Sequence, residues 1–221
     1  MRNGFTVELP TQPTPGDPPD SILTLAGSTT VEFKERRSRF IALAWPAASE
    51  EDANARIAET ARRYHDSRHV CHAWRLGVPP QTRENSNDAG EPSGTAGKPI
   101  LASLRKSELV DSLVVVVRYF GGIKLGTGGL ARAYGQAASE VLAASEVKKI
   151  LLGKEFLLDF PYTLQKTIRH QITLAGGRIV KEQYSEEVAW RIWLPHSCWR
   201  KFQNDLTERT SGSVDLREIS D

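Results

Sequence analysis

The residues from Gly126 to Leu130 form the stretch of the sequence best suited to binding chemistry. They read GTGGL, follow the string RYFGGIKL, and lead into apolar residues spaced three and four apart. This spacing predicts an amphipathic helix with Thr127 as its N-cap. The first amides of a helix have no partners within it, and the helix dipole adds positive charge beside them. We therefore predict a site for a phosphate or sulfate group at Gly126, Thr127, Gly128, Gly129 and Leu130.

The same glycines also fit two roles that involve no isolated anion. Residues 126–131 match the pattern G-x-G-x-x-[GA], and Glu146 lies twenty positions after Gly126, as in a dinucleotide fingerprint. That fingerprint directly follows its strand, whereas residues 118–125 intervene here, so the context argues against it. Glycines also permit turns and close packing without binding anything. Anion binding and packing alone both remain open from the sequence.

A basic cluster is the second candidate for function. Four cations fall within residues 34–39, between two segments whose residues alternate as in strands, which predicts a hairpin turn. Such a turn is either simply solvated or contacts the phosphates of a nucleic acid. Three further cations lie near the glycine-rich stretch. The predicted nucleic-acid-binding residues are Lys34, Arg36, Arg37, Arg39, Arg118, Lys124 and Arg132.

A long polar loop, residues 79–97, is the third candidate. It lacks hydrophobic periodicity, and loops of this length in compact domains tend to be functional or mobile. Two loop carboxylates can hold magnesium, although loop acids are more often solvated. Pro99 suits the first turn of a short helix, whose start would be a second anion site. The groups predicted to contact a ligand are Asp88, Glu91, Thr95 and Lys98.

The histidines and cysteines do not predict a metal centre. In the predicted strand 69–76, the odd spacing of His69 and His72 places them on opposite faces. His72 shares an apolar face and is expected in the core, which leaves His69 as the candidate for an exposed role. Cys71 and Cys198 are too isolated for a disulfide framework. We expect no metal and no cofactor, and we assign no catalytic residue.

The composition predicts a cytoplasmic globular protein. The chain has 221 residues, of which 39% are hydrophobic and 25% charged, as is usual for soluble proteins. No apolar run approaches the length of a membrane span, and the first residues lack the apolar core of a signal peptide. Residues 114–117 are four valines, which predict one buried strand.

The order of the predicted elements indicates an α+β protein with two domains. Residues 1–20 are rich in proline and predict a disordered tail. Residues 21–150 contain the motifs described above and form the predicted N-terminal domain. Residues 151–221 show strand and helix patterns in the order βαββαβ, which is a ferredoxin-like unit. Residues 20–150 carry a net charge of +3, so nucleic-acid binding would have to depend on local clusters.

Four strings occur in one order: the basic turn ending in SRFI, then HVCHAW, DAGEPSGTAGKP and RYFGGIKLGTGGLARAY. Together they resemble the IMPACT family in its bacterial, YigZ-like form. The resemblance implies an N-terminal domain with the superfold of elongation factor G domain IV, and a C-terminal domain like domain V of that factor. Asn87 stands where the family usually has an acid, which weakens any paired-carboxylate mechanism. Eukaryotic relatives regulate translation initiation by competing for the activator of an eIF2-alpha kinase, with an additional N-terminal domain.

These observations leave three hypotheses of function. The first is a non-enzymatic, translation-associated regulator that binds RNA or the ribosome through its basic surface. The second is an enzyme that acts on a phosphorylated or nucleotide ligand at the glycine-rich loops. The third is a protein-interaction module that uses an edge of the C-terminal sheet. The expected partners are RNA or the ribosome, or a phosphate-bearing ligand, and no membrane; the sequence does not predict an oligomeric state.

Overall fold

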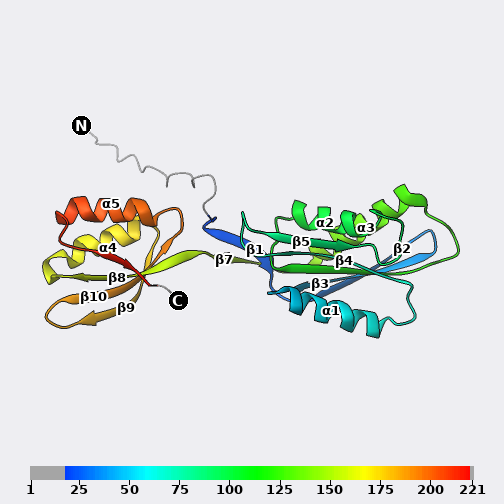
Figure 1. Ribbon diagram of the computed structural model, residues 1–221, viewed down its shortest axis with the longest axis horizontal. Coiled ribbons are helices and arrows are strands. Elements are labelled where there is room, and N and C mark those ends of the chain that lie inside the picture. The colour runs from blue at the N-terminus through cyan, green and yellow to red at the C-terminus, as the bar shows by residue number, and fades with distance from the viewer. Residues whose placement is uncertain (1–17, 220–221) are drawn as a thin grey trace. The chain divides into compact units, whose positions relative to one another are not determined.

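The computed structural model describes residues 18–219, and most of the predicted tail lies outside them. The chain divides into two compact units (Figure 1). The N-terminal unit is Ile22–Ile150, and the C-terminal unit joins residues 151–219 to residues 18–21. The strands β1 (Ser21–Leu25) and β7 (Val147–Leu151) pair with each other, so the chain enters and leaves the N-terminal unit through adjacent strands. The predicted α+β class is confirmed.

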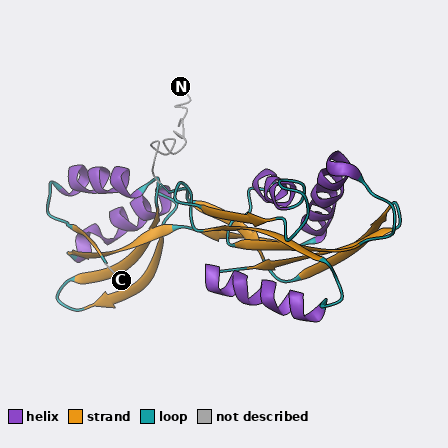
Figure 2. Ribbon diagram, turned by 45° about the vertical axis from the view of Figure 1, so that its right-hand side comes forward, coloured by secondary structure: helices purple, strands orange, loops and turns teal. Residues whose placement is uncertain are grey.

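The N-terminal unit is built on a five-stranded antiparallel sheet with the order β2-β3-β6-β4-β5. Helix α1 covers one face of the sheet, and helices α2 and α3 cover the other (Figure 2). The bounds are β2 Thr29–Glu35, β3 Ser38–Pro46, α1 Glu50–Arg63, β4 His69–Leu76, β5 Arg83–Asn87, α2 Gly97–Lys106, β6 Ser112–Tyr119 and α3 Gly126–Ala144. No helix in residues 18–219 is long and apolar enough to cross a membrane.

The four valines form the middle of the central strand, β6, as predicted. Val114 and Val116 pack in the core beneath α2 and α3, while Val115 and Val117 belong to clusters on the α1 side. All four are fully buried. Because side chains alternate along a strand, burial of every residue means that both faces of β6 are covered.

Two local expectations were wrong. The predicted loop 79–97 contains the strand β5, whose sequence RENSN is polar because it pairs with β4 at the sheet edge and has no apolar face to bury. Helix α3 begins at Gly126, with Leu125 as its N-cap and no side-chain cap. Thr127 therefore lies inside the first turn and does not cap the helix.

The C-terminal unit has the predicted βαββαβ order, with sheet order β11-β8-β10-β9 and antiparallel neighbours. Its elements are β8 Gly153–Phe160, a 3-10 turn Tyr162–Leu164, α4 Gln165–Leu174, β9 Arg178–Tyr184, β10 Val188–Pro195, α5 Trp199–Thr210 and β11 Leu216–Glu218. Alternate residues such as Phe156 and Leu158 form the core with the two helices. This is the ferredoxin-like arrangement.

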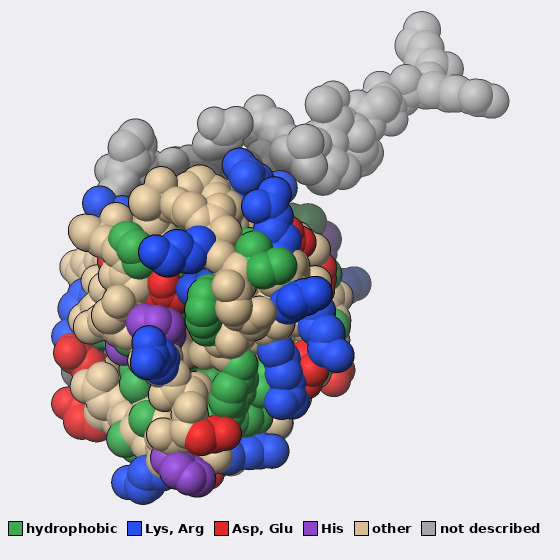
Figure 3. Space-filling view, turned by 90° about the vertical axis from the view of Figure 1, so that its right-hand side faces the viewer, with side chains coloured by type: hydrophobic (Ala, Val, Ile, Leu, Met, Phe, Trp, Pro, Cys, Tyr) green, Lys and Arg blue, Asp and Glu red, His purple; other side chains and the backbone are tan. Residues whose placement is uncertain are grey.

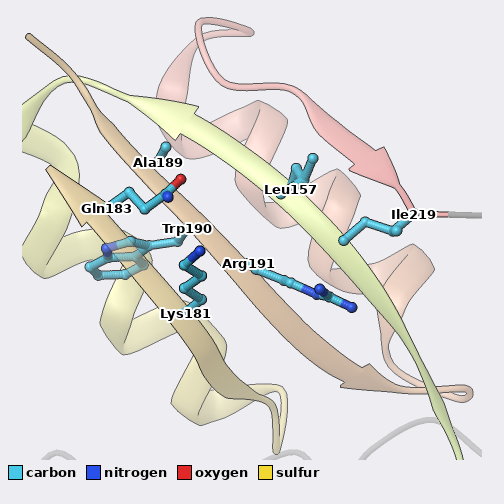
Figure 4. A pocket seen from close by; sticks show the side chains of 7 residues that line it. All are labelled: Leu157, Lys181, Gln183, Ala189, Trp190, Arg191 and Ile219. Carbon is cyan, nitrogen blue, oxygen red and sulfur yellow. The ribbon is translucent and has the colours of Figure 1, made fainter. Parts of the chain in front are cut away.

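The other face of the C-terminal sheet carries polar and apolar side chains together. Leu157 and Arg191 alternate with core residues and so lie on this face (Figure 4). With Lys181 and Gln183 they line a pocket of about 300 Å³. The third hypothesis concerns an edge of this sheet instead, and its edge strands are β11 and β9.

Candidate functional site

The C-terminal end of β6 brings three of the four sequence motifs together. In the sheet, Arg118 on β6 lies between Phe40 on β3 and His69 on β4. The chain then leaves the sheet through Phe120 and starts α3 at Gly126. A pocket of about 390 Å³ opens here, which we call the strand-end pocket. Its lining includes Arg68, His69, Glu91, Pro92, Arg118, Phe120, Lys124, Leu125, Gly126, Thr127 and Leu130.

Glu91 is the buried acid of the strand-end pocket. Its side chain is 4% exposed, and its Oε1 accepts hydrogen bonds from Arg118 Nη1 at 2.7 Å and from the Tyr134 hydroxyl at 2.8 Å. Burial is the main cause that raises the pKa of Tyr134, so this phenol stays protonated and donates. The carboxylate thereby ties the loop that carries it to β6 and α3.

Arg118 is not part of an exposed basic surface, and that prediction is corrected. Its side chain is only 6% exposed because β6 is the central strand. Its guanidinium lies 5.6 Å from the ring centroids of both Phe40 and Phe120 and pairs with Glu91. A guanidinium held in this way is not an exposed surface cation. Its Nε is buried and has no hydrogen-bond partner within residues 18–219.

His69 forms part of the pocket wall and is less exposed than predicted. Its side chain is 19% exposed, because residues of the loop after β5 pack over it. Nδ1 lies 2.9 Å from the carbonyl oxygen of Ala89. A carbonyl only accepts, so Nδ1 carries a proton and donates it to this contact. Nε2 of His69 is 4.0 Å from Glu91 Oε1.

Asp88 has a structural role that the sequence did not predict. Its Oδ1 accepts the amides of Ala96 and Gly97, each at 2.9 Å, and its Oδ2 accepts the amide of Gly94 at 2.8 Å. Burial alone would raise the pKa of Asp88, but the three amides and nearby Lys98 outweigh it and lower the pKa below its usual value. The predicted anion site at the start of α2 is therefore filled by this side chain.

The other groups of the predicted ligand loop do not converge on the pocket. Thr95 is buried and donates to the carbonyl of Pro92 at 2.7 Å, and Lys98 is exposed at the start of α2. Burial raises the pKa of Cys71 to about 12, so its thiol is not a nucleophile at neutral pH. No group of three or more His, Cys, Asp or Glu side chains within residues 18–219 is arranged to hold a metal.

The basic turn between β2 and β3 packs directly against the glycine-rich segment. Arg36 and Arg37 have φ angles of 43° and 67°, which make the turn tight. A Cβ on Gly121 would overlap the backbone carbonyl of Arg37, and the Gly121 amide donates to Ser38 Oγ at 3.3 Å. Gly121 is thus needed for packing. Gly126, by contrast, has no other atom within 4 Å of a Cβ placed on it.

The remaining predicted cations differ in whether their charge is already paired. Arg39 pairs with Glu32 at 2.7 Å and lies over the ring of Tyr119, while Arg36 is 3.8 Å from Glu35. Basic side chains spread across this end of the N-terminal unit (Figure 3). The predicted cations that are exposed and form no ion pair within residues 18–219 are Lys34, Arg37, Lys124 and Arg132. The same holds for Arg68, which lies outside every sequence motif.

The fold and the site define the class of protein. Residues 36–142 match the family described as Impact N-terminal domain, and residues 158–213 match a domain of unknown function, DUF1949. The chain belongs to the IMPACT family, which confirms the resemblance seen in the four strings.

Relatives match almost the whole chain. IMPACT family member YigZ of Escherichia coli (strain K12) is 34% identical over 91% of this chain and 100% of its own length. IMPACT family member YvyE of Bacillus subtilis (strain 168) is 34% identical over 90% of this chain and 91% of its own. A solved structure titled "Crystal structure of an hypothetical protein" is 33% identical, covers 91% of this chain and 98% of its own, and has a TM-score of 0.61.

Proposed function

We propose that this protein is a translation-associated regulator in the cytoplasm that binds RNA, free or within the ribosome. Membership of the IMPACT family supports a translation-related regulatory role. The RNA would bind the cationic end surface, which we define as Lys34, Arg36, Arg37, Lys124 and Arg132. The observation that carries the proposal is the packing of the basic turn on Gly121. This contact sets the basic turn beside the segment that leads through Lys124 to α3.

The state of each cation favours phosphate binding by this surface. A cation that neutralises a phosphate releases counterions, and this release drives nucleic-acid binding. A cation already paired with a carboxylate contributes less to it. Four of the five side chains of the cationic end surface have no ion pair within residues 18–219, and Arg36 has only a long one. Local clustering thus compensates for the small net charge of the chain.

The test is the salt dependence of RNA binding. Changing Arg36 and Arg37 to alanine should lower the slope of log affinity against log salt by about 0.7–0.9 per lost contact. Both residues are exposed, so the free energy of unfolding should change by no more than about 0.5 kcal/mol per site. A matched control changes Lys148 and Lys149, two exposed neighbours on β7, which should leave the slope unchanged.

The direct assays are RNA binding at low salt and co-sedimentation with ribosomes. A wild-type protein that neither binds RNA nor co-sediments would refute the proposal. The second hypothesis would then gain weight, because the strand-end pocket offers a place for a phosphorylated ligand beside the start of α3. Anion binding at Gly126–Leu130 is itself a prediction, to be measured by titration with phosphate.

A further inference from the structure

We infer that the strand-end pocket holds one unpaired nucleotide of a bound RNA, with its base against Phe120 and its phosphate beside the start of α3. The inference rests on the proposed function, since it assumes that RNA follows the cationic end surface. It adds a chemical preference that the cations alone do not give. Phosphate contacts bind single and double strands alike, whereas a pocket for a base accepts only an unpaired one.

Phe120 is the feature of the pocket that phosphate binding leaves unexplained. Phe120 is 52% exposed, although Arg118, two residues earlier, is buried. The Arg118 guanidinium lies 5.6 Å from the ring centroid on one side, and Glu91 fixes that guanidinium at 2.7 Å. The ring is therefore supported from behind by a buried ion pair. A supported aromatic ring beside exposed cations is the usual platform on which proteins stack a base of single-stranded RNA.

Other lining residues of the pocket suit a phosphate. They include the cations Lys124 and Arg68, and Gly126 and Thr127, the first residues of α3. The start of α3 has no side-chain cap, whereas Asp88 fills the start of α2. The same pocket contains a buried donor without a partner in residues 18–219, the Nε of Arg118. These observations together point to a polar, anionic ligand at this end.

The inner side of the pocket can recognise the edge of a base. His69 Nδ1–H donates to Ala89, so in the neutral ring Nε2 is the nitrogen that offers an acceptor. The volume of about 390 Å³ falls within the range of small-ligand pockets. A base in a duplex would have to leave its stack to enter, which costs free energy. The geometry thus favours a single, unpaired nucleotide.

The experiment measures RNA binding by fluorescence anisotropy at several salt concentrations. Two RNAs of equal length are compared, an unstructured single strand and a fully paired duplex. Uridine monophosphate is the third ligand and represents a free nucleotide. We expect Phe120→Ala to weaken binding of the single strand by about 5-fold to 100-fold. The slope with salt should not change, because no phosphate contact is lost. Binding of the duplex should be unaffected.

Two variants serve as controls for this substitution. Ile123→Ala removes a 40% exposed aliphatic side chain from the same segment, and it should leave binding of the single strand unchanged. Phe120→Tyr keeps the ring and should bind like the wild type. Thermal unfolding of each variant shows whether the fold is intact, which we expect because Phe120 is half exposed.

The results separate this inference from the proposed function. If Phe120→Ala binds the single strand like the wild type, while changes at Arg36 and Arg37 still reduce the salt slope, RNA binding stands and the nucleotide pocket is refuted. If no RNA binds at all, the proposed function fails as well. Tight, Phe120-dependent binding of uridine monophosphate without binding of the oligonucleotide would assign the pocket to a free nucleotide and overturn the RNA assignment.

Discussion

The change Glu91→Ala should destabilise the N-terminal unit severely. It removes the acceptor of Arg118 Nη1 at 2.7 Å and of the Tyr134 hydroxyl at 2.8 Å. It also leaves a guanidinium that is 6% exposed without a compensating charge. Removing one partner of a buried ion pair costs about 3–5 kcal/mol, and the lost tyrosine bond adds about 1 kcal/mol. The expected loss, about 4–6 kcal/mol, approaches the whole stability of a typical domain.

The measurement has to report on the N-terminal unit alone. Tryptophans occur in both units, so whole-protein fluorescence mixes their unfolding transitions. Hydrogen exchange of the β6 amides in increasing urea avoids this, because these amides exchange only when the central sheet opens. A second variant, Arg118→Met, completes a double-mutant cycle. The double variant should be less destabilised than the sum of the single variants, by about 1–3 kcal/mol, because neither charge is left alone.

The control for Glu91→Ala is Glu59→Ala. Glu59 is exposed on α1 and has no ion pair within residues 18–219, so its loss should change stability by no more than about 0.5 kcal/mol. Equal effects of the two substitutions would refute the reasoning from the buried ion pair. A cycle without coupling would show that Glu91→Ala acts through lost packing and not through the charge of Arg118.

Four further predictions concern the basic turn, the polar loop, the cysteines and the domain boundary. Gly121→Ala should displace the basic turn, lowering the melting temperature and weakening RNA binding together, since a Cβ there overlaps the turn backbone. Asp88→Ala should cost about 1–3 kcal/mol near neutral pH through its lost amide bonds. Because folding lowers the pKa of Asp88, the stabilisation by its carboxylate is present above the unfolded pKa of about 3.9 and is lost as pH falls through the folded pKa. Urea unfolding at several pH values should show the difference in stability between wild type and Asp88→Ala shrinking at low pH. A thiol reagent at pH 8 should modify Cys198 in the native protein and reach Cys71 only after denaturation. We also expect residues 22–150 to fold when expressed alone, and a product without cooperative unfolding would contradict a domain boundary close to Gly153.

The hydrophobic pattern of the sequence predicted the regular elements well. Strand β4 occupies the expected residues 69–76, and the C-terminal unit follows the expected order of strands and helices. Periodicity succeeds here because each of these elements buries one face or, in β6, both faces. The sequence did not predict strand β5, because this strand is held by backbone pairing at a sheet edge. Its side chains are polar and show no hydrophobic pattern.

The chemistry of the site depended on contacts that the sequence pattern does not contain. Arg118 and Lys124 both appear in the sequence as cations near glycines, yet Arg118 is buried and Lys124 is exposed. Arg118 is buried because it lies on the central strand, β6, and its partner Glu91, 27 positions earlier, reaches it only in the folded chain. Asp88 resembles a ligand group until the loop closes and presents three amides to it. The sequence pattern did not indicate Phe120 as a site residue, because the exposure of an apolar side chain can be seen only in the folded structure.

The pairing of Asp20 with Ser197 has a consequence for biosynthesis. Asp20 accepts the Ser197 amide at 2.8 Å and the Ser197 hydroxyl at 2.5 Å, across 177 positions of sequence. The C-terminal unit therefore includes residues that leave the ribosome before the N-terminal unit and others that leave after it. The whole N-terminal unit is made between them, and domains generally fold as they emerge. Vectorial synthesis thus makes the cationic end surface available before the C-terminal unit can close.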